Sequence, residues 1–297
     1  MKKPKILITG STGALGKILI PKIQEKKYEC LGIARNASRN ESNFNTVKCD
    51  VAEIDDIKSI IAEFQPSFII HLAGLTGNIE CEKNPKDAFV SNVLSTCNIL
   101  KASIKIKPKI VFASSREVYG NTEKKAKEKD QLKPININGI TKMLSENLIL
   151  NYHVQYKMPY EVLRFTNFYG ENCEKRGISA MIRNAMQGKL ISIFGGKQNL
   201  DLLYFDDAAS AIIKAINYDK SDIFNIGSGD STTLLSLVKK IEEIRKKKIP
   251  FEIKPYRDFE VKKFAVDMTK SRNILKFRAV HHLDWVLKRM FDKWSTN

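Results

Sequence analysis

The sequence predicts an α/β protein built on a doubly wound parallel (Rossmann) sheet, with a smaller interleaved α/β lobe. Over residues 5–170, short apolar runs alternate with longer amphipathic segments, which is the pattern of consecutive βαβ units. A glycine-rich turn joins the first apolar run to the first amphipathic segment. The 297 residues, of which 43% are hydrophobic, suffice for a sizeable core.

The first unit runs from the apolar residues 5–9 through a glycine turn into a helix with apolar positions at helical spacing. Gly10 permits the tight turn, Gly13 lets a phosphate approach the backbone, and Gly16 lets the helix pack on the strand. A diphosphate would rest on the N-terminus of this helix, where free N–H groups and the helix dipole favour an anion. The turn therefore predicts nucleotide binding.

The remaining elements follow the same alternation until about residue 170. Strands are predicted at 30–34, 47–51, 68–74, 109–113 and 160–165, and helices at 86–105 and 138–157. Beyond this point the predicted elements are a helix at 178–188, a strand at 190–194, a helix at 206–216, a strand and loop at 224–229, a helix at 232–247 and a last helix containing Trp285. We expect a dinucleotide-binding domain at 1–166 plus 203–227, and a substrate-binding lobe at 167–202 plus 228–297.

Composition limits the possible partners and compartment. The formal charge of +17 attracts anions in general, but the lysines are scattered, so a solvated surface is favoured over a nucleic-acid patch. No apolar stretch is long enough for a membrane span, so no membrane span is expected, and no signal peptide is expected before the first strand. Five cysteines without a CxxC pair favour reduced thiols in a cytoplasmic protein, and no metal site is expected.

The end of the second predicted strand bears on the choice of cofactor. An NAD-binding protein usually places Asp or Glu there to bond the ribose 2′-hydroxyl. This chain has Arg35 and, further on, Arg39. Because an arginine suits a 2′-phosphate, NADP is favoured, although NAD is possible and a solvated Arg35 is the alternative.

The ordered motifs resemble the extended short-chain dehydrogenase/reductases, the NAD(P)-dependent nucleotide-sugar epimerase/dehydratase family. The matching segments run from end to end of the chain: residues 9–16 (TGxxGxxG), Asp50-Val51, residues 71–74 (HxAA/G), Asn92-Val93, residues 114–120 (SSxxVYG), residues 164–170 (RxxNxYG), residues 195–207, residues 225–227 and residues 267–270. Leu200 departs from the family, which commonly has an arginine there that helps to hold the substrate diphosphate.

The resemblance implies binding roles for specific residues. Implied cofactor-binding residues are Gly10, Thr12, Gly13, Ala14, Leu15, Gly16, Arg35, Asp50, Val51, Leu72, Ala73, Gly74, Asn92, Lys142 and Thr166. Implied substrate-binding residues are Thr76, Ser115, Arg116, Asn167 and Arg257. His71 is interpreted as a strand-end histidine rather than a catalyst. The implied substrate is a nucleotide-diphosphate sugar.

The catalytic motif contains the main departure from the family. In the family, the tyrosine of YxxxK takes a proton from a sugar hydroxyl, its lysine lowers the pKa of the phenol, and a Ser/Thr hydroxyl bonds the same oxygen. Ser115 occupies the Ser/Thr place, Lys142 the lysine place and Asn138 the tyrosine place. An amide has no usable pKa near neutrality, so Asn138 cannot be the general base.

Three accounts of Asn138 remain open. Another group could carry the proton: Glu117, Tyr119, Tyr169, or Lys142 through a water. Glu117 matches a catalytic Glu of dehydratase and decarboxylase branches, but it could equally order the loop. The protein could instead bind cofactor and sugar nucleotide with little or no turnover, or the tyrosine could have been removed deliberately to trap a complex.

The leading hypothesis is an epimerase/dehydratase-type enzyme that works by transient hydride transfer at a sugar carbon. The alternative is a catalytically impaired protein that binds NAD(P) and a nucleotide sugar. The resemblance also implies a homodimer formed through the helices at 86–105 and 138–157. Packing of these helices in the core explains their apolar faces equally well.

Overall fold

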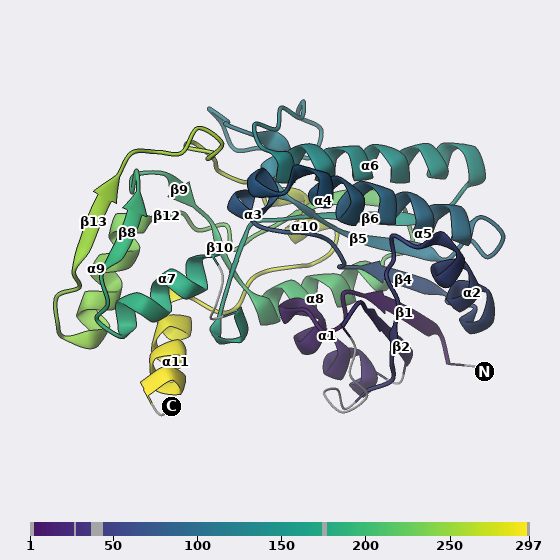
Figure 1. Ribbon diagram of the computed structural model, residues 1–297, viewed down its shortest axis with the longest axis horizontal. Helices are drawn as coiled ribbons and strands as arrows, with labels where there is room; N and C mark the ends of the chain where they lie inside the picture. The colour runs from purple at the N-terminus through teal and green to yellow at the C-terminus, as the bar shows by residue number, and fades with distance from the viewer. Residues whose placement is uncertain (1–2, 27, 37–43, 174–176, 296–297) are drawn as a thin grey trace.

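The computed structural model describes residues 3–26, 28–36, 44–173 and 177–295 and is organised around one large sheet (Figure 1). In the described residues this sheet has seven strands in the order β11-β6-β5-β4-β1-β2-β3, and every adjacent pair is parallel. Its strands are β1 (Lys5–Thr9), β2 (Glu29–Ala34), β3 (Thr46–Lys48), β4 (Phe68–His71), β5 (Lys109–Ser115), β6 (Tyr160–Phe165) and β11 (Asp222–Ile226). The predicted doubly wound sheet is confirmed.

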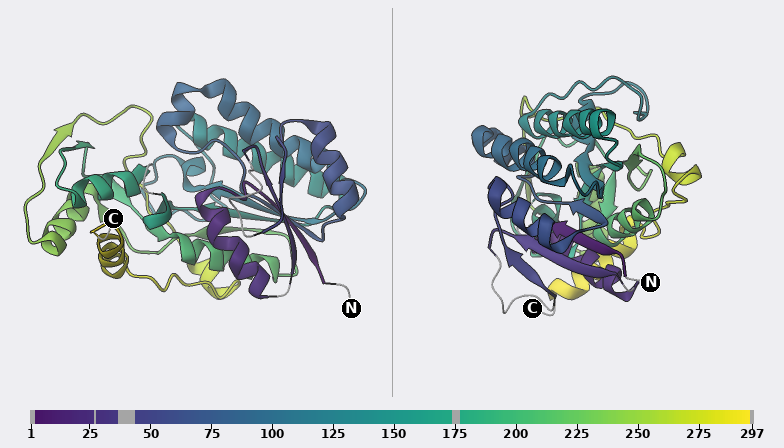
Figure 2. Two further views of the ribbon diagram at one scale, coloured as in Figure 1. Left: turned by 60° about the horizontal axis from the view of Figure 1, so that its bottom comes forward. Right: turned by 90° about the vertical axis from the view of Figure 1, so that its right-hand side faces the viewer.

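Helices cover both faces of the sheet (Figures 1 and 2). One face carries α1 (Ala14–Glu25), α8 (Phe205–Ile216) and α10 (Thr269–Asn273), and the other carries α2 (Ile54–Phe64), α5 (Ser95–Ser103) and α6 (Ile137–Tyr156). Neighbouring residues of β1 point into different cores: Ile6 and Ile8 pack with α1 and α8, whereas Leu7 packs with α2 and α5. Burial on both faces explains why the strands read as continuous apolar runs.

A second apolar core belongs to the smaller lobe. Its elements are α7 (Gly177–Met186), β8 (Ile191–Phe194), α9 (Leu234–Arg245), β13 (Phe251–Lys254) and α11 (Leu283–Ser295). Short pairs join this lobe to the sheet region: β7 (Asn167–Tyr169) with β10 (Leu202–Tyr204), and β9 (Asn199–Leu200) with β12 (Thr232–Thr233). Apolar residues of the segment 261–277 pack on the large sheet. The predicted domain boundaries themselves stay a prediction.

Several predicted elements have different limits in the structure. The helix predicted at 86–105 consists of α4 (Pro85–Phe89), a π-helical turn η1 (Val90–Leu94) and α5. The strand predicted at 47–51 ends at Lys48, because Cys49 to Ala52 form a turn in which the Asp50 carboxylate accepts the Ala52 N–H at 3.0 Å. Helix α9 begins at Leu234, since the preceding two residues pair with β9.

The helices α2 and α3 (Asn78–Lys83), and the short strands of the smaller lobe other than β8, were not among the predicted elements. The turns η2 (Arg116–Tyr119) and η3 (Glu171–Cys173) complete the described elements. Arg39 lies outside the described residues. No helix in the described ranges is long and apolar enough to cross a membrane. All five cysteines are free thiols.

Candidate functional site

The glycine turn between β1 and α1 fits closely against its neighbours. Gly10 has φ +70°, and a Cβ there would lie 2.8 Å from the Ala73 backbone nitrogen. A Cβ on Gly16 would lie 2.5 Å from the Ser11 carbonyl oxygen. Helix α1 begins after Gly13 with no side-chain cap and no acidic residue in its first turn. Its first N–H groups therefore remain available to an anion.

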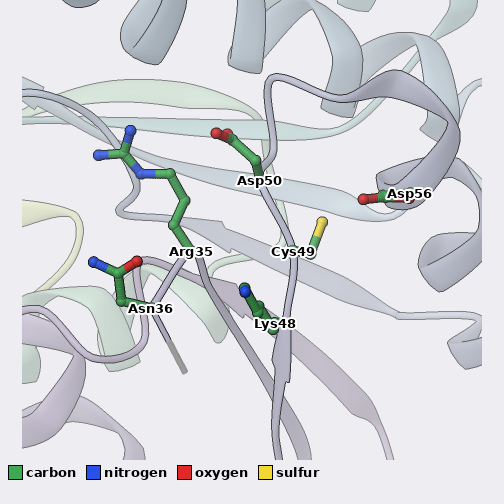
Figure 3. A pocket seen from close by; sticks show the side chains of 6 residues that line it. All are labelled: Arg35, Asn36, Lys48, Cys49, Asp50 and Asp56. Carbon is green, nitrogen blue, oxygen red and sulfur yellow. The ribbon is translucent and has the colours of Figure 1, made fainter. Parts of the chain in front are cut away.

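A cavity of about 520 Å³ opens at the carboxyl ends of β2 and β3 (Figure 3). Its lining residues are Arg35, Asn36, Lys48, Cys49, Asp50 and Asp56. Within the described ranges, neither Arg35 nor Lys48 forms an ion pair. The sequence analysis identified Arg35 and Asp50 but missed Lys48, whose only sequence signal is its position two residues before Asp50.

Behind the glycine turn, Asn92 and Lys142 meet at Gly74. A Cβ on Gly74, where φ is +155°, would lie 2.5 Å from Asn92 Oδ1 and 3.7 Å from Lys142 Nζ. The Asn92 amide nitrogen donates to the Leu75 carbonyl at 3.1 Å and to Thr141 Oγ1 at 2.9 Å. Its Oδ1 is buried without a partner in the described residues. This orphaned acceptor beside an ammonium group fits a ligand with hydroxyl donors.

Lys142 lies in the interior at the first turns of α6. Its ammonium donates to the Ala113 carbonyl at 2.8 Å and lies 4.7 Å from the centre of the Phe112 ring. Burial lowers the pKa of Lys142 from 10.5 to about 8, against the opposing effects of the Cys81 thiol and the Glu146 carboxylate. An amine with this pKa exchanges protons readily near neutral pH.

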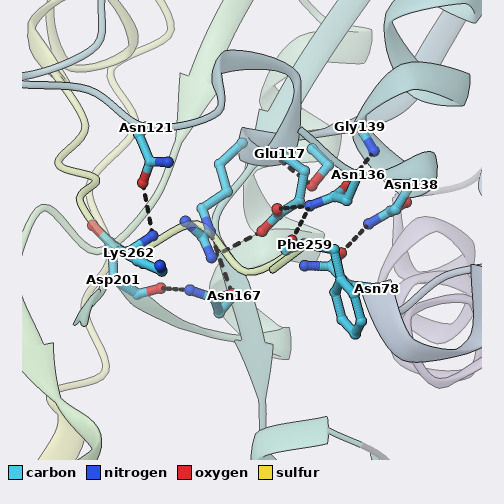
Figure 4. Close-up of polar contacts among 12 residues, drawn as sticks. Asn78, Glu117, Asn121, Asn136, Asn138, Gly139, Asn167, Asp201, Phe259 and Lys262 are labelled. Carbon is cyan, nitrogen blue, oxygen red and sulfur yellow. Dashed lines mark hydrogen bonds and ion pairs between the residues drawn. The ribbon is translucent and has the colours of Figure 1, made fainter. Parts of the chain in front are cut away.

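Asn138 is almost completely buried one helical turn before Lys142. Its amide nitrogen donates to Asn78 Oδ1 on α3 at 3.1 Å (Figure 4). Its own Oδ1 is buried and has no partner among the described residues. The Asn78 contact fixes the orientation of the amide, so Asn138 presents an acceptor at the position where a tyrosine was expected.

The ion pair between Arg116 and Glu117 lies beside Asn138 in the same region. Arg116 NH2 lies 2.8 Å from Glu117 Oε1, and the Asn136 amide nitrogen donates to Glu117 Oε2 at 2.6 Å. Asn136 also caps α6 by accepting the Gly139 N–H at 2.8 Å (Figure 4). The Glu117 carboxylate is thus held as part of the loop that abuts α6. The adjacent Ser115 hydroxyl oxygen accepts the Glu117 N–H at 3.2 Å.

The two tyrosines considered as proton carriers lie in apolar cores. Burial raises the pKa of Tyr119 to about 12, against the opposing effect of Arg164, and its hydroxyl contacts Arg164 and Asn225. Burial also raises the pKa of Tyr169, which packs in the core of the smaller lobe. His71 is fully buried between Thr9 and Thr96, and burial lowers its pKa to about 3. It is therefore neutral, as expected for a strand-end histidine.

The expected substrate-binding residues are spread around this centre. Asn167 accepts a bond from Arg116 Nε at 3.4 Å, whereas Thr76 is exposed on the loop before α3. Arg257 pairs with Glu260 at 3.0 Å, and its guanidinium carbon lies 3.5 Å from the centre of the Phe194 ring. The Thr166 hydroxyl, in an expected cofactor-binding residue, donates to Asp201 at 2.8 Å. Leu200, at the position where an arginine was expected, is buried in the second core.

Three further polar residues, all around the start of α6, were missed from the sequence. Asn136 precedes the α6 pattern as an N-cap asparagine usually does, so local sequence could have found it. Asn78 carries no such signal, since its contact with Asn138 spans 60 residues. Glu82 accepts the Ile137 N–H at 2.7 Å and likewise joins α3 to the start of α6.

The described residues fit a dinucleotide that runs across the carboxyl ends of the strands. The uncapped α1 N-terminus can hold its diphosphate, the cavity at Arg35 and Asp50 its adenosine end, and the polar groups of Asn92 and Lys142 near Gly74 its second ribose. A Cβ at Gly10, Gly16 or Gly74 would clash with protein atoms that hold these segments together. Ser115 ends β5, and Lys142 on α6 reaches the Ala113 carbonyl near the same strand end.

Comparisons with known proteins agree with this geometry. The model of the NAD dependent epimerase/dehydratase family matches residues 6–227. A putative UDP-glucose 4-epimerase of Methanocaldococcus jannaschii is 31% identical over 91% of this chain and 92% of its own length. A UDP-N-acetyl-alpha-D-glucosaminuronate decarboxylase of Bacillus cytotoxicus is 27% identical over 93% of this chain and 92% of its own length.

The fold also matches solved structures over nearly the whole chain. The UDP-glucose 4-epimerase of Thermotoga maritima, crystallised with UDP-glucose, superimposes with a TM-score of 0.92. The two proteins are 26% identical, and the match covers 98% of this chain and 99% of the other. The chain therefore belongs to the NAD dependent epimerase/dehydratase family, among the nucleotide-sugar enzymes of the extended short-chain dehydrogenase/reductases.

Proposed function

We propose that this protein is an NAD(P)-dependent enzyme that modifies a nucleotide sugar, with Lys142 in place of the missing tyrosine as the proton carrier. The observation that carries the proposal is the state of Lys142: it is buried, has a pKa of about 8, and lies one helical turn from the orphaned Oδ1 of Asn138. About a quarter of such lysines are neutral at pH 7.5 and able to accept a proton.

In this proposal, Ser115, Lys142 and Asn138 each take part in moving the proton of the sugar hydroxyl. The chemistry that a bound nicotinamide supplies is hydride transfer to and from a sugar carbon. Ser115 bonds the reacting hydroxyl, whose proton passes to Lys142 through a water that donates to Asn138 Oδ1. Asn138 is shorter than tyrosine, and we propose that this water takes the position of the phenol. The proton returns by the same path when the keto sugar is reduced.

The cationic side chains at the adenosine end support NADP over NAD. Arg35 takes the place where NAD-binding proteins use an acid, and Lys48 lines the same cavity. Asp50 and Asp56 also line this cavity. We therefore propose that the 2′-phosphate of NADP lies between Arg35 and Lys48. Equilibrium binding of NADP and NAD to wild type and Arg35→Ala tests this: tighter NAD than NADP binding by wild type contradicts it.

The names of the relatives support a uridine nucleotide. The matched proteins include a putative UDP-glucose 4-epimerase and UDP-glucuronic acid decarboxylases of Arabidopsis thaliana. The substrate we propose is accordingly a UDP-linked hexose or hexuronate whose diphosphate contacts Arg257. Whether the keto sugar is then epimerised, dehydrated, decarboxylated or reduced depends on groups beyond the shared site.

One observation favours a second candidate, a catalytically impaired protein that binds the cofactor and a nucleotide sugar. The carboxylate best placed to replace the tyrosine, Glu117, is engaged by Arg116 and Asn136. If Lys142 does not move the proton, no described group at this position does.

Purified protein incubated with NAD or NADP and a panel of UDP-, GDP-, CDP- and dTDP-sugars separates the two candidates. We expect a new sugar resonance by NMR with wild type, its loss in Lys142→Met, and a faster reaction in Asn138→Tyr. Absence of product from every sugar, with nucleotide binding intact, contradicts the enzyme and supports the binding protein.

We also propose a homodimer in the cytoplasm. Large apolar side chains are partly exposed on α4, η1 and α6, among them Phe89, Leu94 and Val154, and free cysteines suit a reducing compartment. Phe89→Glu should convert a dimer to a monomer in light scattering after size exclusion. A wild-type monomer at micromolar concentration contradicts the proposal.

A further inference from the structure

We propose that Arg116 makes the sugar site selective for a nucleotide sugar that carries a carboxylate, a uronic acid, over the matching neutral hexose. The inference rests on the nucleotide-sugar function proposed above and names the class of sugar.

Arg116 is a buried cation at the carboxyl end of β5. It directly follows Ser115 and is only 6% exposed. Its NH2 meets Glu117 Oε1 at 2.8 Å, and its Nε lies 3.4 Å from Asn167 Oδ1, a long contact for a hydrogen bond. The guanidinium carbon lies 5.0 Å from the centre of the Phe264 ring. These contacts fix the plane of the guanidinium between three different segments of the chain.

The third nitrogen of this group has no acceptor. NH1 is buried and makes no hydrogen bond to any described residue. A guanidinium is always charged, and NH1 carries two N–H donors. Leaving such donors buried without an acceptor is energetically unfavourable. A ligand that supplies an acceptor at NH1 removes this cost.

A carboxylate suits this position better than a hydroxyl does. Hydrogen bonds between a guanidinium and a carboxylate are roughly twice as strong as neutral ones. The carboxylate that pairs with Arg116, Glu117, is shared with Asn136 and does not bond to NH1. Glu260 Oε1 pairs with Arg257. Neither reaches NH1. Glu117 repels a second anion, but the +17 charge of the chain opposes this repulsion.

The position of Arg116 assigns the carboxylate to the sugar rather than to the diphosphate. Arg116 is adjacent to Ser115, which we propose to bond the reacting hydroxyl. Through Glu117 and Asn136 it is also connected to the start of α6, where Asn138 lies. The group that reaches NH1 is therefore a substituent of the sugar ring itself.

Titration calorimetry on the cofactor-loaded protein with UDP, UDP-glucose and UDP-glucuronic acid tests the inference. We expect wild type to bind UDP-glucuronic acid at least about tenfold more tightly than UDP-glucose, which corresponds to about 1.4 kcal/mol. Equal affinities, or tighter binding of UDP-glucose, overturn the inference without any variant. Failure of all three ligands to bind overturns the proposed function as well.

Two variants with opposite expected signs sharpen the test. Arg116→Gln should abolish the preference by weakening UDP-glucuronic acid about tenfold while UDP-glucose changes less than about twofold. Glu117→Gln removes the anion that competes for Arg116 and should increase the preference. Equal effects of Arg116→Gln on both sugars would show a structural role only and overturn the inference. Circular dichroism confirms that each variant is folded.

Discussion

The orientation of Asn138 depends on one side chain from another helix. Asn78 Oδ1 accepts the Asn138 amide N–H at 3.1 Å, which directs the orphaned Asn138 Oδ1 away from α3. Asn78→Ala should leave the Asn138 amide free to rotate and slow turnover by up to about tenfold, the equivalent of one net hydrogen bond. Initial rates with the substrate found in the NMR panel measure this.

Asn78→Asp is the matched control because it keeps an acceptor for the Asn138 N–H. We expect it to retain more activity than Asn78→Ala, with the dissociation constant of UDP unchanged in both variants. Equal rates for wild type and Asn78→Ala would mean that the amide orientation does not matter to the chemistry.

The buried Lys142 gives a pH prediction that needs no turnover. Its folded pKa of about 8 lies below the ordinary value of 10.5 because burial disfavours the ammonium form. In NMR of protein labelled at lysine Cε, one resonance should titrate near pH 8, and Lys142→Met should remove it. Because the folded pKa is depressed, Lys142 destabilises the fold below pH 8, and this penalty disappears as the pH rises from 8 to 10.5.

A Lys142 resonance that titrates above pH 10 would contradict this assignment and with it the proton-carrying role. The rate of sugar turnover should rise with pH and level off above the pKa of Lys142, since the neutral amine is the active form.

At the residue scale, the positions of the site residues could be predicted from the sequence, but most of their side-chain contacts could not. The spacing Asn138 to Lys142 and the place of Ser115 follow from local motifs. The contacts of Asn78, Glu82 and Lys48 do not, because they arise where segments distant in sequence meet. That the Glu117 carboxylate is engaged by its neighbour Arg116 was equally invisible without side-chain geometry.

The start of α6 is the element on which the proposed chemistry depends. Asn136 caps it, Glu82 accepts its first N–H, and Gly139 packs so tightly that a Cβ there would lie 2.4 Å from the Glu117 carbonyl oxygen. Asn136 also donates to Glu117 Oε2 and to the Phe259 carbonyl. One asparagine thus joins the helix, the η2 turn and the C-terminal segment.

Two substitutions of Asn136 should separate its role as the cap of α6 from its hydrogen bond to Glu117. Asn136→Ala removes the cap and should destabilise the protein by about 1–2 kcal/mol at all pH values. Asn136→Asp keeps the cap but places a second carboxylate against Glu117 Oε2. The shared site raises a carboxyl pKa in the folded state, so the stability of this variant should fall as the pH rises from 4 to 7.

Urea unfolding at pH 4, 5.5 and 7 measures both effects. Thr233→Ala, which removes the cap of α9 in the smaller lobe, is the control and should cost about 1 kcal/mol without a pH trend. If Asn136→Asp and Asn136→Ala show the same pH dependence, the contact with Glu117 does not contribute as proposed.

Elements with strong periodicity were predictable and short ones were not. The helices α1, α6, α8 and α9 show apolar spacing that the sequence analysis used. The pairs β7–β10 and β9–β12 involve two or three residues each, which is too short for a period of two to be visible. The π-helical turn η1 changes the helical register at Asn92 without any composition signal.

At the scale of the whole molecule, the doubly wound parallel sheet followed from the βαβ rhythm of the sequence, but the order of its strands was not predicted. The smaller lobe was harder to predict because its core combines segments that are distant in the sequence, such as α7 and α9 with α11. Contacts of this kind are set by tertiary packing, not by local sequence. The apolar segment 261–277 illustrates this, since it packs on the large sheet instead of in that core.

A buried ion pair joins the large sheet to α8 at the end opposite the proposed site. Lys109, the first residue of β5, lies 3.0 Å from Glu161 Oε1 on β6, and its Nζ also donates to the carbonyls of Ala215 and Tyr218. Burial raises the pKa of Glu161 to about 8, against the opposing effect of Lys109. Glu161 Oε2 is buried without a partner in the described residues.

This pair should make the global stability depend on pH in a defined direction. The folded state holds the Glu161 proton more tightly than the unfolded chain, whose carboxyl has the ordinary pKa of 4.5. The free energy of unfolding should therefore decrease as the pH rises from about 4.5 to 8, by at most about 1.4 kcal/mol per pH unit from this group. In a Lys109→Met/Glu161→Met double variant this pH-dependent component should vanish, and the apolar pair should be at least as stable as the ion pair near pH 8.

Urea unfolding of wild type and the double variant at pH 5, 6.5 and 8 gives the difference in stability at each pH, in which the contributions of all other carboxylates cancel. A difference that stays constant across this range would show that Glu161 remains ionised in the folded protein and that Lys109 fully compensates its burial.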